Sequence, residues 1–149
     1  MSLLIQLKDE MKTAMRAKDK LRLGVIRMAI SAVKQAEIDH GTEPTDTNVL
    51  AVLTKMIKQR KESIKMFSEG GREELAENEA SEVIALEFFM PQPLSSNEIN
   101  ELVSKAIIDS SAVSMADMGK VMALLKPLMQ GKADMGSVSG LVRESLKTL

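Results

Sequence analysis

The amino-acid sequence predicts an all-α protein, in which an N-terminal helical domain is followed by a C-terminal three-helix bundle. Apolar residues recur at helical spacing along nearly the whole chain. No segment keeps the period-two alternation of a β-strand over a strand's length. Pro91 and Pro93 mark a break, because proline lacks an amide hydrogen and restricts the residue before it. We therefore predict domains over residues 1–90 and 94–149.

Two helices are predicted before the first loop. Ser2 is a suitable N-cap for the first helix, and residues 17–19 form a short charged turn after it. The second helix covers about residues 20–38 and ends near His40 and Gly41. The expected buried stripes are Leu4, Leu7, Met11 and Met15 in the first helix, and Leu23, Ile26, Ile30 and Val33 in the second.

A loop is predicted over residues 41–47, where Thr45 or Asp46 can cap a third helix. This helix runs to about Ser68. It ends at the glycine pair 70–71, because glycine takes the left-handed conformation at low steric cost. We expect it to bury Val49, Leu53, Met56, Ile64 and Phe67, and to expose Lys55, Lys58, Arg60, Lys61 and Lys65.

A fourth helix is predicted over residues 73–89, with Leu75, Val83, Leu86 and Phe89 buried. Seven carboxylates lie between residues 69 and 87, so a magnesium or acid–base site has to be considered. On a helix that also carries a full apolar stripe, such carboxylates more often form a solvated face. We therefore predict a solvated face there.

Three short helices are predicted after the proline break. Ser95 and Glu98 have the spacing of a capping box that opens the first of them. Ser114 and Asp117 repeat this spacing for the second helix, and the third begins after Gly136. The expected buried residues, in helix order, are Ile99, Leu102, Val103 and Ala106; Met118, Val121, Met122 and Leu125; and Val138, Leu141, Val142 and Leu146.

The composition excludes several kinds of chemistry. The 149 residues contain no cysteine, which excludes disulfides, thiolate zinc sites and cysteine nucleophiles. The single histidine, His40, cannot form a two-histidine metal site. We predict no catalytic residue, no metal site and no cofactor. A net charge of −1 argues against a strongly basic nucleic-acid coat, and the lack of tyrosine and tryptophan disfavours stacking on bases. No DNA partner is expected.

The sequence also gives an expectation about location. No apolar run approaches the roughly 18 residues of a membrane span, so no membrane association is expected. Residues 1–10 start with a few apolar residues and continue with charges, which is not the pattern of a secretory signal peptide. We therefore expect a cytoplasmic protein.

Two features leave a protein partner open. Five of the twelve methionines lie between residues 115 and 135, where helical spacing favours a role in the core but a partner-binding surface is the alternative. Eight basic residues between 8 and 34 contrast with the acidic segment 69–87. Both features suit a protein–protein interaction adaptor.

Several short segments together match the pattern of one protein family. They are Asp117–Met122, Lys126–Pro127 and Gly131–Asp134 in the C-terminal part, and Arg60–Ile64, Phe67, Gly70–Arg72 and Leu75–Ala76 in the N-terminal part. In this combination the chain resembles the GatB/YqeY family, and its freestanding YqeY-like branch in particular, over essentially its whole length. It departs from the family pattern at Ser110–Ser111, where a glycine–alanine turn is expected.

The resemblance implies an all-α protein whose C-terminal part is similar to the tail of the GatB component of the glutamine-dependent aspartyl/glutamyl-tRNA amidotransferase, which contacts the body of the tRNA. That complex has a kinase-like catalytic part and an amidase component without counterparts in these 149 residues. The inherited label, carbon–nitrogen ligase with glutamine as amido-N-donor, therefore names a family relationship. The implied function is a non-catalytic tRNA-associated binding module, and the alternative is a protein–protein interaction adaptor without RNA binding.

The resemblance also implies a set of RNA-binding residues. Two Gly-Lys pairs are expected to form one connected surface at helix termini, where backbone amides and lysines can meet phosphates. Three further basic residues are added on charge alone. The expected set is Gly119, Lys120, Lys126, Gly131, Lys132, Arg143 and Lys147.

Overall fold

Every regular element among residues 2–149, which the computed structural model describes, is a helix, so the all-α fold class is confirmed. By its internal contacts the chain divides into two units, one ending at Met90 and the other covering Pro91–Leu149. Each unit has a hydrophobic core of its own.

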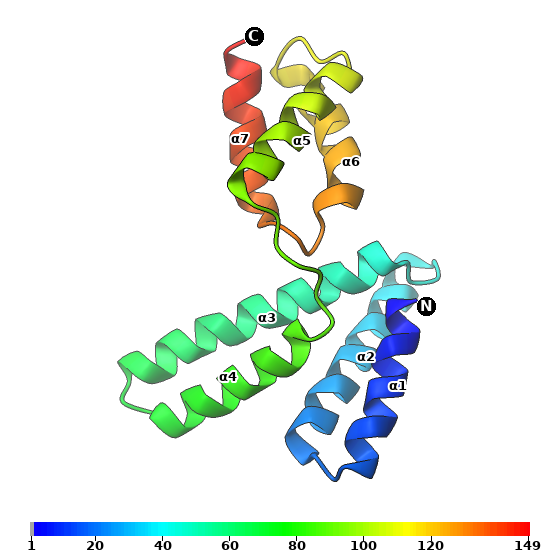
Figure 1. The fold of residues 1–149 in the computed structure, drawn as a ribbon, viewed down its shortest axis with the longest axis vertical. Helices are drawn as coiled ribbons and strands as arrows, with labels where there is room; N and C mark the ends of the chain where they lie inside the picture. Colours follow the sequence, from blue (N-terminus) through cyan, green and yellow to red (C-terminus); the bar gives the residue numbers. More distant parts are fainter. Residues whose placement is uncertain (1) are drawn as a thin grey trace. The chain divides into compact units, whose positions relative to one another are not determined.

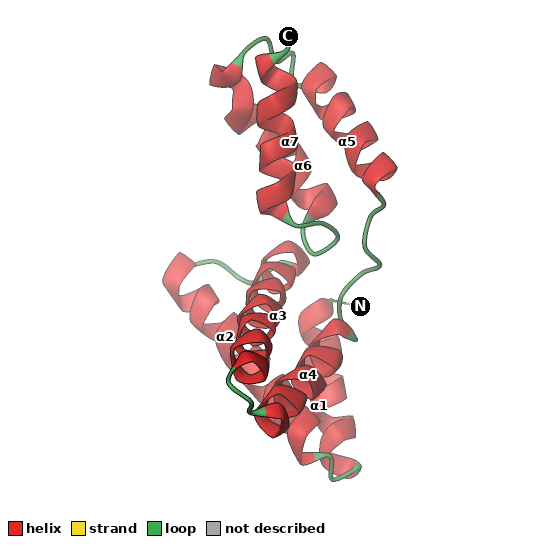
Figure 2. Cartoon of the chain, turned by 90° about the vertical axis from the view of Figure 1, so that its left-hand side faces the viewer, coloured by secondary structure: helices red, strands yellow, loops and turns green. Residues whose placement is uncertain are grey.

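Four helices form the first unit: α1 (Leu3–Arg16), α2 (Lys20–His40), α3 (Asp46–Glu69) and α4 (Glu73–Glu87). Within this unit α1 and α4 lie toward one side, and α2 and α3 lie toward the other (Figures 1 and 2). The core between them is formed by residues from all four helices, among them Leu7, Ile26, Val33, Leu53 and Leu86.

The predicted start of α1 is confirmed, but its predicted stripe is partly wrong. The Ser2 hydroxyl accepts a hydrogen bond from the Ile5 amide at 3.2 Å. The helix buries Leu3, Leu7 and Ala14, whereas Met15 is 47% exposed. Leu4 and Met11 are partly buried against the same core, so Met15 is the residue that departs from the prediction.

Polar side chains at the α2–α3 connection act as caps. Gly41 ends α2 with φ of +67°, a left-handed conformation that favours glycine. Thr45 caps α3 by accepting from the Asn48 amide. The Asp46 carboxylate instead accepts from the Leu3 amide at 2.9 Å, and this bond joins the start of α1 to α3.

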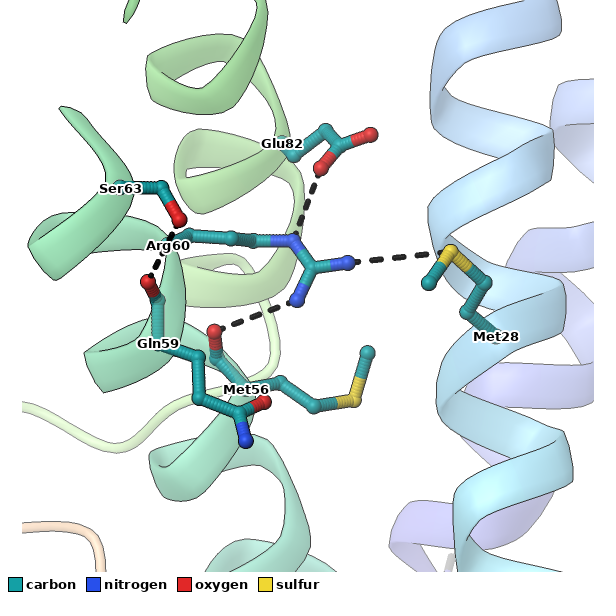
Figure 3. A network of polar contacts seen from close by, with 6 residues as sticks. All are labelled: Met28, Met56, Gln59, Arg60, Ser63 and Glu82. Atoms are coloured by element: carbon teal, nitrogen blue, oxygen red, sulfur yellow. Dashed lines mark hydrogen bonds and ion pairs between the residues drawn. The ribbon is translucent and has the colours of Figure 1, made fainter. Parts of the chain in front are cut away.

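The prediction that Arg60 is exposed is wrong, because the residue is only 8% exposed. Its Nε donates to Glu82 Oε2 at 2.8 Å, and its Nη1 donates to the Met56 carbonyl at 3.2 Å. Nη2 lies 3.7 Å from Met28 Sδ (Figure 3). The guanidinium thus connects α3 with α4 and α2, which explains why a charged side chain is placed in the core.

The α3–α4 connection follows the prediction in its backbone but not in every buried residue. Gly71 has φ of +74°, as expected of the glycine pair that ends α3. On α4, the prediction that Leu75 is buried is wrong: it is 39% exposed, and Ala76 takes its place in the interior.

The second unit contains α5 (Ser96–Asp109), a short 3₁₀ turn η1 (Met115–Asp117), α6 (Met118–Met129) and α7 (Met135–Lys147). Helices α6 and α7 run antiparallel, and α5 packs against both (Figure 1). The core residues are Val103, Ala106, Val121, Leu125, Met129, Val138, Val142 and Leu146. Leu141 differs from the prediction, since it is 40% exposed.

The two predicted caps of the second unit, Ser95 and Ser114, are present, and Asp134 is a third cap. The Ser95 hydroxyl accepts from the Glu98 amide and also bonds the Glu98 carboxylate. Ser114 and Asp117 form a reciprocal capping box, although the box opens η1 and α6 begins only after it. Asp134 caps α7 by accepting from the Gly136 amide.

Candidate nucleic-acid interface

The two Gly-Lys pairs of the predicted site stand at opposite ends of α6. Gly119 and Lys120 lie in the first turn of this helix, and Gly131 and Lys132 lie in the loop after it. A 12-residue helix is about 18 Å long, so the pairs are separated by the length of α6. The structure therefore does not bring them into one connected surface.

The start of α6 already holds an anion of the protein. Asp117 Oδ2 accepts from the Val113 amide at 2.9 Å and from the Ser114 amide at 3.4 Å. These bonds, that from Val113 first, hold the pKa of Asp117 below its ordinary value of 3.8 against the opposing effect of burial. Lys120 Nζ lies 3.7 Å from Oδ1 and lowers this pKa further. The carboxylate makes no cap bond to α6 itself, but its negative charge at this helix terminus would repel a phosphate.

The backbone of the second Gly-Lys pair has a structural role. Gly131 has φ of +79°, which favours glycine. The Lys132 amide donates to the Met129 carbonyl at 2.8 Å, and the Lys132 carbonyl accepts from the Leu94 amide at 2.8 Å. These bonds fasten Leu94, just before α5, to the α6–α7 loop. The side chain of Lys132, and not its amide, is the group that could meet a phosphate.

The three residues added on charge are divided between the two ends of the α6–α7 pair. Lys126 is exposed in the last turn of α6, close along the chain to the loop that holds Lys132. Arg143 and Lys147 lie in the second half of α7 and therefore toward the start of α6. Lys147 pairs with Glu144 at 3.8 Å, whereas Lys126 and Arg143 form no ion pair among residues 2–149.

Most methionines of the C-terminal cluster belong to the core, as their spacing predicts. Met129 is fully buried, and Met118, Met122 and Met135 pack against the same core. Met115 is 39% exposed. The cluster therefore does not form the methionine-rich surface that an adaptor would use.

Sequence reasoning missed an exposed apolar strip on α6. Leu124 is 42% exposed and Leu128 is 51% exposed, one turn apart, with Pro127 exposed beside them. The available signal was that α6 is apolar on almost all sides, apart from its two lysines. Only one stripe of such a helix can face the core of a three-helix bundle.

Residues 2–149 offer neither a metal centre nor a membrane span. This part of the chain has no group of three or more His, Cys, Asp or Glu side chains that could hold a metal ion, and no helix long and apolar enough to cross a membrane. A small cavity beside His40 has a volume of about 10 Å³, which is room for about one water molecule. It is therefore not a ligand site.

Comparison with known proteins identifies several relatives from yeasts. Each carries the name "Altered inheritance of mitochondria protein 41, mitochondrial". The protein from Kluyveromyces lactis is 44% identical over 94 residues, which are 62% of this chain and 51% of the relative. Those from Lachancea thermotolerans and Saccharomyces cerevisiae strain YJM789 are 39% and 35% identical, covering 69% and 68% of this chain and 57% and 56% of the relatives. The chain spans about half the length of the curated relatives it matches.

These relatives contradict the expected cytoplasmic location, because all of them are named as mitochondrial proteins. The expectation rested on residues 1–10 lacking a secretory signal peptide. That pattern concerns secretion alone, since mitochondrial transit segments are amphipathic and arginine-rich and follow different rules.

The family assignment covers nearly the whole chain. The match to the family described as "Yqey-like protein" extends over residues 5–146 and so includes both helical units. It agrees with the motif segments in both halves of the sequence. This chain belongs to the YqeY-like protein family.

Proposed function

We propose that the protein is a non-catalytic, tRNA-associated binding module, related through its second unit to the tail of the tRNA amidotransferase. The single observation that carries the proposal is the division of cations between the two ends of the α6–α7 pair. Lys126 and Lys132 are at one end, and Lys120, Arg143 and Lys147 are toward the other. Lys120 and Lys126 are about 9 Å apart along α6, and Lys120 and Lys132 are separated by about the 18 Å length of this helix, so the two groups can contact separate phosphates of a folded RNA.

The charge balance predicts that this binding is weak and sensitive to salt. The second unit contains six basic and six acidic residues, so it has no net positive charge. Lys120 and Lys147 are also partly neutralised by Asp117 and Glu144. Contacts to phosphate therefore depend on Lys126, Lys132 and Arg143. The affinity for RNA falls as the salt concentration rises, because binding releases counterions from the RNA.

The proposal is tested by the fluorescence anisotropy of labelled tRNA. Lys126→Ala with Lys132→Ala should weaken binding several-fold at about 50 mM salt, because each removes a phosphate contact. Lys120→Ala with Lys132→Ala should also weaken it, but less, because Lys120 is paired with Asp117. Lys105→Ala is the matched control, since Lys105 pairs with Asp109 on α5 and lies outside the proposed site. Equal affinity in all variants would contradict this site.

A protein partner is the second candidate function. The observation that favours it is the exposed strip of Leu124 and Leu128 on α6, since isolated apolar residues are common on surfaces but neighbouring ones mark contact sites more often. If labelled tRNA does not bind, Leu124→Ser with Leu128→Ser becomes the variant to compare with the wild type in partner capture.

A further inference from the structure

Two helices on one side of the first unit expose faces of opposite charge. Helices α1 and α4 lie in the same layer, with α2 and α3 behind them (Figures 1 and 2). Both pack their buried sides onto α2 and α3, so their outer faces turn away from that layer.

The outer face of α1 is basic. It consists of Ile5, Lys8, Lys12, Met15 and Arg16, which recur at intervals of three and four residues. All are exposed, and the two apolar members, Ile5 and Met15, are 49% and 47% exposed. The face thus combines three cations with two apolar side chains that have no place in the core, and Asp9, exposed at its edge, leaves it with a net charge of +2.

The outer face of α4 is acidic. It consists of Glu73, Glu77, Ile84, Glu87 and, just after the helix, Phe88. Ile84 is 71% exposed and Phe88 is 61% exposed. The helix contains six glutamates and no basic residue, and only Glu82, which faces inward to Arg60, is paired. The outer carboxylates have no positive neighbour on their own helix.

The charges of both faces are left uncompensated inside the unit. Among residues 2–149 no ion pair involves the cations of the α1 face or the carboxylates of the α4 face. The pair between Glu10 of α1 and Arg22 of α2, at 2.8 Å, lies between the faces, and the Arg22 guanidinium stacks 4.8 Å from the Phe88 ring. This contact brings the C-terminal end of α4 close to the α1–α2 hairpin.

We propose that this layer is the interface of a two-fold symmetric dimer, in which the α1 face of each copy packs on the α4 face of the other. A two-fold axis running between α1 and α4 exchanges the helices, so the same contact forms twice. Each contact sets Lys8, Lys12 and Arg16 opposite carboxylates of α4, and it covers exposed apolar residues from both helices.

A second copy fits these faces better than any partner of a single charge. A basic partner would match α4 but would be repelled by α1, and an acidic partner would have the opposite problem. Another copy compensates both faces at once. Because exposed ion pairs contribute little each, the apolar residues must supply much of the affinity, and we expect a dimer in the micromolar range or weaker.

The test is a charge exchange followed by sedimentation equilibrium of the full chain. Wild-type protein should show a mass approaching twice 16.3 kDa as its concentration rises. Lys8→Glu with Lys12→Glu should weaken the dimer at least about tenfold, and so should Glu77→Lys with Glu87→Lys, because each places like charges opposite one another. Mixed together, the two variants should form a heterodimer, since both of its contacts are again oppositely charged.

Two further variants keep the test decisive. Ile84→Ser should weaken the dimer without changing its charge, and Lys58→Glu with Lys61→Glu on α3 is the matched control that should leave it intact. All four reversals in one chain should restore the homodimer, and the heterodimer of the two double variants shows that each of them folds. Wild-type protein that stays monomeric at high concentration would overturn the proposal. So would a dimer whose affinity is unchanged by these charge reversals. Neither outcome bears on the tRNA proposal, which concerns the second unit.

Discussion

At the scale of single residues, an ion pair explains why Arg60 is buried although the sequence pattern predicts that it is exposed. A helical periodicity puts Arg60 among lysines on an exposed face, because the pattern records only the type of side chain. In the structure its guanidinium finds a carboxylate from α4, a carbonyl from α3 and a sulfur from α2. The position of the carboxylate, 22 residues away, is not visible in a local pattern.

Removing the partner of this buried cation should be costly. Glu82→Ala is expected to destabilise the first unit by about 1–3 kcal/mol, because it removes the carboxylate partner of the buried Arg60 guanidinium, while the 27% exposure of Glu82 lets water replace part of the contact. Urea denaturation measures the change. Glu74→Ala, on the same helix but exposed, is the control and should shift stability by no more than about 0.5 kcal/mol. Equal effects of the two substitutions would contradict this role for Glu82.

Asp117 gives the second unit a stability that depends on pH. Its pKa in the folded protein lies below the ordinary 3.8, so the unfolded chain takes up a proton there more readily as pH falls. The stabilisation is therefore complete above about pH 5 and is lost as pH falls through 3.8 toward the folded pKa. In thermal melts, the difference between wild type and Asp117→Asn should be constant near neutral pH and shrink in acid. A difference that stays the same down to about pH 3 would argue against it.

At the scale of elements, the ends of the helices could be predicted well and their buried faces less well. Ser2, Thr45 and Ser95 all cap the helices expected of them, because a cap is a local hydrogen bond between residues close in sequence. Leu75 and Leu141 were misplaced, since the face that a helix buries depends on where its neighbours pack. The prediction that the two Gly-Lys pairs form a single surface was wrong for the same reason, because the sequence motif does not show that they lie at opposite ends of α6.

Just after α5, Ser111 has an unfavourable backbone conformation whose effect on stability can be tested. Ser111 has φ of +56°, a conformation that glycine adopts more easily than serine. Ser111→Gly should stabilise the second unit by about 0.5–1 kcal/mol, as judged by thermal denaturation. Ser110→Gly is the control, because Ser110 has φ of −84° and gains nothing from glycine. Stabilisation by both substitutions, or by neither, would go against this explanation.

At the scale of the whole molecule, we propose that the two units are domains that fold independently. Each has its own core, and the proline break at residues 91–93 lies between them. A fragment of residues 1–90 and one of residues 91–149 should each be helical and unfold cooperatively, although the shorter one is expected to be marginally stable. Circular dichroism during heating checks this. Fragments that remain unfolded alone but become helical when mixed would show that the domains depend on each other.

The most direct test of the proposed function is whether the full chain binds tRNA through charge. Anisotropy of labelled total tRNA should show saturable binding at about 50 mM salt, with an affinity that falls linearly on a double-logarithmic plot toward about 200 mM. Lys126→Ala with Lys132→Ala should make this slope shallower, because fewer phosphates are then neutralised. No saturable binding at about 50 mM salt, or binding that does not change with salt, would contradict the proposed function.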